Sequence, residues 1–100
     1  MLDEYQTKKE AAKILFTALK YNEAFVAYRD TLDVCNFKDE LVTVYSNMAM
    51  CSIKVHKYEQ ALVCVNSALE KSTGSDINPE VMIKLKYRLA LCLAHLRDYD

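Results

Sequence analysis

The sequence predicts an all-α fold built from antiparallel helix hairpins, and three observations support this class. Its 100 residues include one glycine, Gly74, and one proline, Pro79, whereas an all-β chain of this length needs many turn residues. Apolar side chains recur at three- and four-residue spacings along nearly the whole chain. Alanine and tyrosine also repeat together at long intervals, which indicates a repeated helical unit.

The first three helices follow from apolar spacing and from the residues at their ends. The first helix is expected at residues 4–19, and a second stretch follows Tyr21-Asn22 as far as Cys35, before Asn36-Phe37-Lys38 breaks the pattern. Val42-Thr43-Val44 alone is compatible with a strand. Seventeen residues without turn chemistry instead favour a third helix from Asp39, as N-cap, to Val55.

Two further helices complete the prediction. The fourth is expected at residues 59–71, and the one clear loop follows at Ser72–Asn78. Asn78 is suited to cap a fifth helix with Pro79 at its first position, and that helix should run to about Leu96. Short connections between the five helices imply antiparallel hairpins.

Charge and apolar content limit the classes of function. Thirteen basic and fourteen acidic residues give a net charge of −1, which argues against a general nucleic-acid or membrane binder. The longest uncharged stretch, Leu41–Ile53, is too short to span a bilayer. Asp3 and Glu4 precede any apolar run, so the N-terminus does not resemble a secretory signal. A soluble, cytoplasmic protein is expected.

The cysteines and histidines do not predict a metal or redox site. The four cysteines contain no CxxC pair, and the two histidines are not spaced with them as in a zinc module. The cysteines are expected to be small apolar residues in the helical cores of a reduced protein, and each histidine a polar helix residue. No cofactor is predicted. The residues in question are Cys35, Cys51, Cys64, Cys92, His56 and His95.

A repeat of alanine and tyrosine organises the chain. Tyr21, Tyr58 and Tyr99 follow each other at intervals of 37 and 41 residues, and an alanine precedes each of them by nine residues. Small residues at fixed places let two helices approach closely, while the tyrosine fills the inner corner of the hairpin. The alternative is a four-helix bundle in which this phasing is coincidental. The alanines are Ala12, Ala49 and Ala90.

This layout resembles the 34-residue tetratricopeptide (TPR) repeat over nearly the whole chain. The resemblance implies one domain, residues 1–100, that stacks as a right-handed superhelix. Repeat 1 covers about residues 5–38 and repeat 2 about 42–75, and a fifth, capping helix covers about 79–97. The extra residues relative to the TPR repeat fall in the connections, where insertions cost little.

In such a stack, the first helix of each pair lines a concave groove. The predicted lining contains five basic residues and no acidic one, with Glu10 at its margin. This lining predicts an anionic, extended partner. Two pairs within it, Lys9 with Lys13 and Lys84 with Arg88, place like charges one helical turn apart, which brings no folding benefit. The lining residues are Gln6, Lys9, Lys13, Phe16, Thr43, Ser46, Asn47, Met50, Lys54, Lys84, Tyr87, Arg88 and Leu91.

The spacing of these groups resembles the carboxylate-clamp TPR domains of heat-shock co-chaperones. In that family a Lys and an Asn of the first helix, an Asn of the third, and a Lys and an Arg of the fifth hold a C-terminal Glu-Glu-Val-Asp peptide. The first Lys falls on Lys9, the third-helix Asn on Asn47, and the fifth-helix pair on Lys84 and Arg88. The first-helix Asn falls on Lys13, which is a departure from the family pattern.

The resemblance also implies partners and secondary contacts. The expected partner is the C-terminal peptide of heat-shock protein 90 or 70, with Phe16 and Met50 in apolar contact with it and Lys54 as an auxiliary cation. Within this family, Tyr45–Lys54 and Lys84–Leu89 most resemble the small TPR adaptor of the RuvB-like ATPase and PIH-domain co-chaperone assembly, and the match extends over residues 40–92. In that adaptor the partner-binding tail follows the fifth helix, so a PIH-domain protein and RuvB-like ATPases are possible partners through a tail absent from this sequence.

The sequence is compatible with two functions and argues against a third. The first is a non-catalytic co-chaperone adaptor with a carboxylate clamp. The second is a general TPR scaffold that binds an internal acidic or helical segment of a partner. An enzyme is set aside, because the sequence offers no nucleophile–base pair at compatible spacing and no glycine-rich phosphate loop. Residues Leu96–Asp100 reach the corner of a third hairpin, so the fifth helix either caps the domain or is cut within a repeat.

Overall fold

The computed structural model describes residues 3–74 and 76–97, and the predicted all-α class is confirmed there. The described residues contain no strand. A short 3₁₀ turn, Leu32–Val34, follows the second helix. The five helices are α1 (Glu4–Thr17), α2 (Tyr21–Thr31), α3 (Lys38–Lys54), α4 (Tyr58–Ser72) and α5 (Pro79–Arg97).

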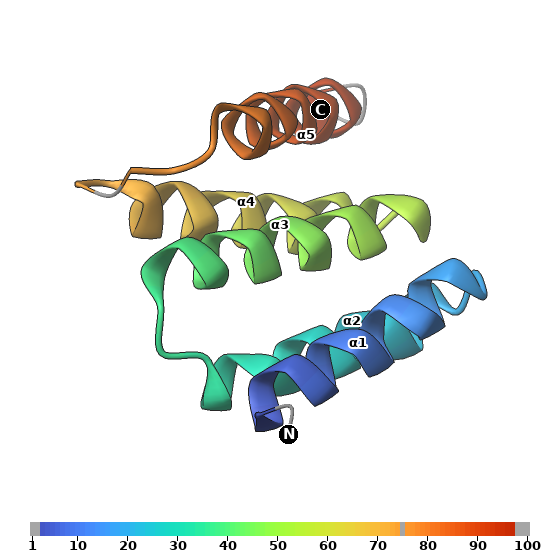
Figure 1. Ribbon diagram of the computed structural model, residues 1–100. Helices are drawn as coiled ribbons and strands as arrows, with labels where there is room; N and C mark the ends of the chain where they lie inside the picture. The colour runs from blue at the N-terminus through green and yellow to red at the C-terminus, as the bar shows by residue number, and fades with distance from the viewer. Residues whose placement is uncertain (1–2, 75, 98–100) are drawn as a thin grey trace.

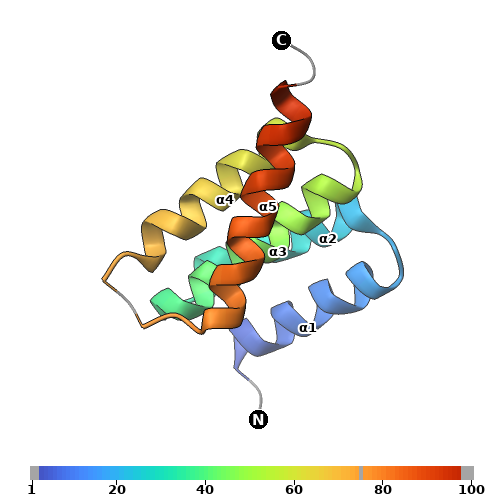
Figure 2. The ribbon, with the colours of Figure 1, turned by 90° about the horizontal axis from the view of Figure 1, so that it is seen from above.

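The helices form two antiparallel hairpins and a third layer (Figure 1). Helix α1 pairs with α2, and α3 pairs with α4. The α2 helix packs on α3, and α5 packs on both α3 and α4. As a result, the helices lie in successive layers, in which α1 and α3 run in similar directions and α5 crosses over α3 obliquely (Figure 2). This is the arrangement of a helical-repeat protein.

The two hairpin turns repeat each other residue by residue at an interval of 37. Leu19 and His56 each adopt the left-handed backbone conformation, with φ of 64° and 61°. The next residues, Lys20 and Lys57, have nearly the same φ and ψ, −92°/69° and −96°/72°. Their amides donate to equivalent carbonyls, those of Leu15 and Ser52, at 3.0 and 2.8 Å. The repeat predicted from alanine and tyrosine is therefore also a repeat of backbone geometry.

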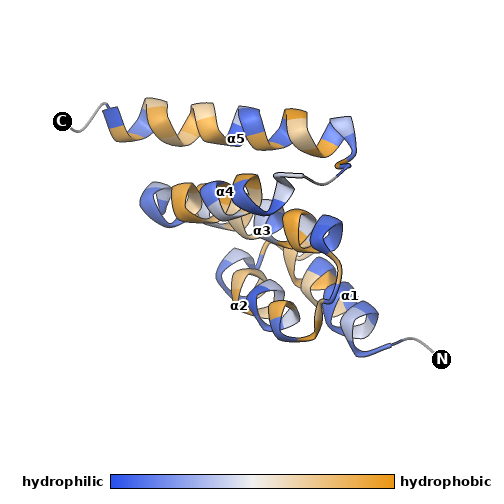
Figure 3. Cartoon of the chain, turned by 90° about the vertical axis from the view of Figure 1, so that its left-hand side faces the viewer, coloured by the Kyte–Doolittle hydropathy of each residue, from blue (hydrophilic) through white to orange (hydrophobic). Residues whose placement is uncertain are grey.

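The predicted role of the repeated alanines holds at two of three positions. Ala12 and Ala49 are fully buried, and so are Ala24 and Ala61 on the partner helices of the two hairpins. Ala90 is exposed, because in the described part of the chain no second helix packs on that side of α5. Tyr99, the third repeated tyrosine, lies outside the described residues. Hydrophobic residues nevertheless occur along every helix, including α5 (Figure 3).

Most helix boundaries agree with the sequence within about two residues, but α2 ends at Thr31, four residues before the predicted Cys35, and one cap is wrong. Helix α3 begins at Lys38, after the extended residue Phe37, and Asp39 lies inside its first turn. The main-chain oxygen of Asp39 accepts a hydrogen bond from Thr43 Oγ1 at 3.2 Å. The predicted cap at Asn78 is confirmed, since its Oδ1 accepts from the Glu80 amide at 2.8 Å.

The cysteines and histidines match the sequence prediction only in part. Cys51, Cys64 and Cys92 are buried, one in each of α3, α4 and α5, as expected. Cys35 is half-buried and lies in the link between the hairpins rather than in a helix. His56 is likewise not a helix residue, because it occupies the left-handed position of the α3–α4 turn.

No helix in the described ranges combines the length and the apolar character needed to cross a membrane.

Candidate functional site

Arg88 of α5 is the most buried charged residue of the predicted site, with 9% of its surface exposed. Its Nη1 donates to the main-chain oxygen of Ser46 on α3 at 2.9 Å, and also to the Ser46 hydroxyl. Burial lowers the pKa of Arg88 below its ordinary value. Within residues 3–74 and 76–97, no carboxylate forms an ion pair with this guanidinium.

Asn47 and Lys84 lie next to the Arg88–Ser46 contact. Asn47 follows Ser46 on α3 and is half-buried. Lys84 is exposed and precedes Arg88 by one turn of α5, so both side chains lie on the same side of that helix. Three of the five predicted clamp residues thus lie on α3 and α5, the two helices that the Arg88–Ser46 contact joins. Lys54 is exposed two helical turns beyond Asn47, at the C-terminal end of α3.

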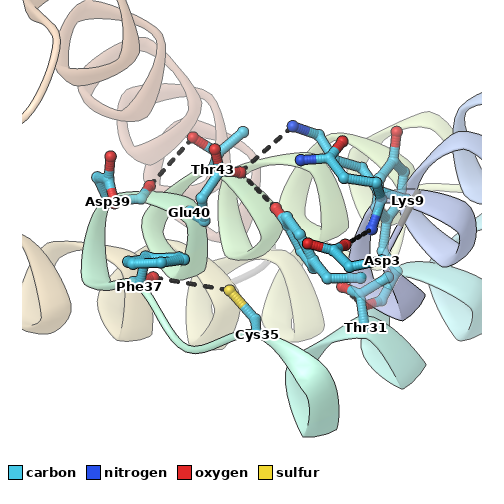
Figure 4. Close-up of polar contacts among 11 residues, drawn as sticks. Asp3, Lys9, Thr31, Cys35, Phe37, Asp39, Glu40 and Thr43 are labelled. Carbon is cyan, nitrogen blue, oxygen red and sulfur yellow. Dashed lines mark hydrogen bonds and ion pairs between the residues drawn. The ribbon is translucent and has the colours of Figure 1, made fainter. Parts of the chain in front are cut away.

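Lys9 of α1 is engaged by a carboxylate that the sequence analysis missed (Figure 4). Its Nζ lies 3.3 Å from Glu40 Oε2 on α3, and the two side chains are 33% and 32% exposed. The Tyr5 hydroxyl donates to the same oxygen. The pKa of Glu40 is lowered, mainly by the Tyr5 hydrogen bond and also by Lys9, despite its burial. Burial and the nearby Glu40 raise the pKa of Tyr5.

Glu40 is not among the predicted lining residues because it precedes Thr43, the first residue of α3 in that lining. A signal was available, since Glu40, Thr43 and Asn47 follow at three- and four-residue spacing and share one face of α3. The expected acid-free lining is therefore wrong at the Lys9 end.

The remaining α1 residues of the predicted site differ in exposure. Lys13 is exposed and borders a shallow hollow of about 290 Å³, together with Glu10, Ile14 and Thr17. Phe16 is half-buried, and its ring packs edge-on against Tyr21 with centroids 5.2 Å apart. On α3, Met50 is also half-buried. Lys13 is thus the more accessible of the two α1 lysines in the predicted site.

Another hollow, of about 760 Å³, lies away from these residues. It is bordered by His56 and Tyr58 at the α3–α4 turn and by His95 near the end of α5. Tyr58 and His95 stack with ring centroids 4.1 Å apart and an interplanar angle of 8°. The structure places none of the predicted clamp residues here. In the described part of the chain, no three His, Cys, Asp or Glu residues are grouped as metal ligands.

Fold and site together define an all-α helical-repeat protein with cationic side chains on the first helix of each pair. No protein-family model matches the chain. The chain is similar to protein unc-45 homolog B of Mus musculus, with 34% identity over 92 residues. The match covers 92% of this chain but 9% of that protein, so the chain spans less than a tenth of the relative's length.

Proposed function

We propose that the protein is a non-catalytic, cytoplasmic co-chaperone adaptor that binds the acidic C-terminal tail of a chaperone through a carboxylate clamp. The ligand is a peptide of the Glu-Glu-Val-Asp type, as in the tails of heat-shock protein 90 or 70. The observation that carries the proposal is Arg88, a cation that is 9% exposed and lacks a carboxylate partner among the described residues.

A buried cation without a counter-charge is costly, and a ligand carboxylate removes that cost. Ser46 occupies one nitrogen of the guanidinium, Nη1. No buried side-chain nitrogen or oxygen of the described residues lacks a hydrogen-bond partner, so the other Arg88 donors are not sealed inside the protein. An arginine that retains accessible donors is suited to bind a carboxylate with two parallel hydrogen bonds.

The neighbouring groups suit the end of a peptide chain. A terminal aspartate has a main-chain and a side-chain carboxylate, and Lys84, Asn47 and Arg88 supply donors from two helices. On α1, Lys13 supplies a further exposed cation, whereas Lys9 is already paired with Glu40, and Lys54 of α3 is auxiliary. Phe16 and Met50 offer partly exposed apolar surface to the residues that precede the aspartate.

The clamp residues and their placement support this ligand, whereas the likeness to protein unc-45 homolog B concerns the chain as a whole. A PIH-domain protein and RuvB-like ATPases are further partners of the proposed adaptor.

A second candidate is a scaffold that binds an internal amphipathic helix with acidic residues. Exposed apolar side chains on α5 favour it, since Ile83 and Tyr87 are 67% and 63% exposed and immediately precede Lys84 and Arg88 in the sequence. Such a partner would place its apolar face on these residues and its acids on the lysines. It needs no free chain end.

The proposed clamp is tested by titrating the protein with a fluorescent peptide ending in Glu-Glu-Val-Asp and following anisotropy. The adaptor predicts saturable binding that is lost when Lys84 is changed to Met. The matched control is Lys86→Met, an exposed lysine two residues along the same helix and off the Lys84–Arg88 side. Equal loss in both variants, or none in either, would refute the clamp.

A further inference from the structure

Glu40 forms an ion pair with Lys9, one of the cations on which the resemblance to a carboxylate clamp depends. Its Oε2 accepts from the Tyr5 hydroxyl and lies 3.3 Å from Lys9 Nζ. Tyr5 and Lys9 are one turn apart on α1, so two adjacent side chains of one helix hold a single oxygen of α3 (Figure 4). Of the side-chain hydrogen bonds between described residues, these are the ones that connect α1 to α3.

We propose that Glu40 is an internal carboxylate that neutralises Lys9 and takes the place that a ligand carboxylate would otherwise have there. This inference rests on the proposed function for the identity of the ligand. It assigns Glu40 a specificity role: the Lys9 end of the site rejects an additional anion, and the α1 cation that meets the peptide is Lys13.

The helix geometry supports the shift from Lys9 to Lys13. Along α3, Asn47 lies two turns, about 10 Å, beyond Glu40. Because α1 and α3 run in similar directions, moving from Lys9 to Lys13 on α1 leads toward the level of Asn47 (Figure 2). Lys13 is exposed, whereas one third of the Lys9 side chain is exposed. Along the helix direction, Lys13 is therefore closer than Lys9 to the Arg88–Ser46 contact, and its side chain is accessible to a ligand.

The charge balance supports the same conclusion. A ligand carboxylate that approaches Lys9 also approaches Glu40, and two anions close together repel each other. The Tyr5 hydrogen bond stabilises the charged form of Glu40, so its carboxylate keeps its negative charge near neutral pH. Lys9 becomes an additional ligand cation only when the charge at position 40 is removed.

Peptide titrations of two variants test this inference. Glu40→Gln keeps an oxygen that can accept from Tyr5 but removes the charge, so the free-acid peptide should bind at least about threefold tighter. The double variant Lys9→Met/Glu40→Gln has the same charge at this place as the wild-type ion pair, and it should bind within about threefold of wild type. A smaller gain in the single variant, or a larger loss in the double variant, overturns the inference.

Glu4→Gln is the matched control. It removes one negative charge from α1 and breaks an exposed ion pair with Lys8, whose atoms lie 3.8 Å apart. Peptide affinity should change by less than about twofold, because exposed pairs are weak and screened. A gain equal to that of Glu40→Gln would show that net charge alone, and not release of Lys9, controls affinity, and would overturn the inference.

A readout without ligand separates this inference from the proposed function. With a limiting amine-reactive ester and peptide mapping, acylation of Lys9 should rise in Glu40→Gln, while acylation of Lys8 stays constant. If labelling responds in this way but no variant binds the peptide, the proposed function fails and neutralisation of Lys9 by Glu40 stands. If Lys9 labelling is unchanged, the inference fails whatever the peptide does.

Discussion

Arg88 Nη1 donates a hydrogen bond to the main-chain oxygen of Ser46 at 2.9 Å, and this contact joins α5 to α3 next to Asn47. A guanidinium in this place is expensive for folding, since it is buried and no carboxylate of the described residues balances its charge. Residues that cost stability without a structural return are characteristic of functional sites.

Replacing Arg88 with methionine should abolish peptide binding but leave the fold intact. Methionine fills a similar volume without a buried charge, so the free energy of unfolding should stay within about 1 kcal/mol of wild type or increase. Urea denaturation measures the stability, and anisotropy measures binding. Arg29→Met, at an exposed position of α2, is the control and should change neither. A loss of more than about 2 kcal/mol in Arg88→Met would mark Arg88 as a structural residue.

The alanines of the repeat should differ in their tolerance of larger side chains. Ala12→Leu and Ala49→Leu introduce bulk at fully buried positions and should each destabilise the protein by about 1–3 kcal/mol. Ala90→Leu lies at an exposed position and should stay within about 0.5 kcal/mol of wild type. Urea denaturation of the three variants checks this. Similar losses at all three sites would mean that Ala90 is also covered in solution.

The repeat was predictable because it is encoded in spacing along the chain. The spacing of Ala12 and Ala49 indicates where each repeat begins, and the turns at Leu19 and His56 are separated by the same interval. The left-handed backbone of these two residues was not predictable, since neither is glycine. The partners of Lys9 and Arg88 were not predictable either. They depend on which side chains of α3 reach across to α1 and α5, and sequence spacing within one helix does not specify that.

Acid should remove the contribution of Glu40 to stability. Its pKa is held below the ordinary value of 4.5, first by the Tyr5 hydrogen bond and then by Lys9. Between the folded and unfolded pKa values the unfolded chain binds more protons, so stability falls as pH falls through this range. At pH 7 the free energy of unfolding of the wild type should exceed that of Glu40→Gln by less than about 1 kcal/mol, because the Lys9–Glu40 pair is partly exposed.

Urea midpoints of both proteins from pH 7 to pH 3 measure this effect. The difference should be constant above about pH 5 and should shrink below the ordinary carboxyl pKa of 4.5. A difference that stays unchanged down to pH 3 would contradict the assigned contacts of Glu40.

The four thiols should react at two very different rates. Burial raises the pKa of Cys51 and of Cys64 to about 11 and also raises that of Cys92, so these thiols are protonated at pH 8 and shielded. Cys35 is half-buried in the link between the hairpins. A disulfide reagent such as Ellman's should therefore modify one thiol rapidly. Cys35→Ser should remove the fast phase, and two or more fast thiols in the native protein would contradict the packing of α3, α4 and α5.

Recognition of a free carboxyl end is tested by comparing two forms of one peptide. Dissociation constants are measured for a peptide ending in Glu-Glu-Val-Asp as the free acid and as the C-terminal amide, at the same salt concentration. Loss of one charge-assisted contact predicts that the amide binds at least about tenfold more weakly, and Arg88→Met should bind neither form. Equal affinity of the acid and the amide would contradict the clamp and favour a scaffold for internal segments.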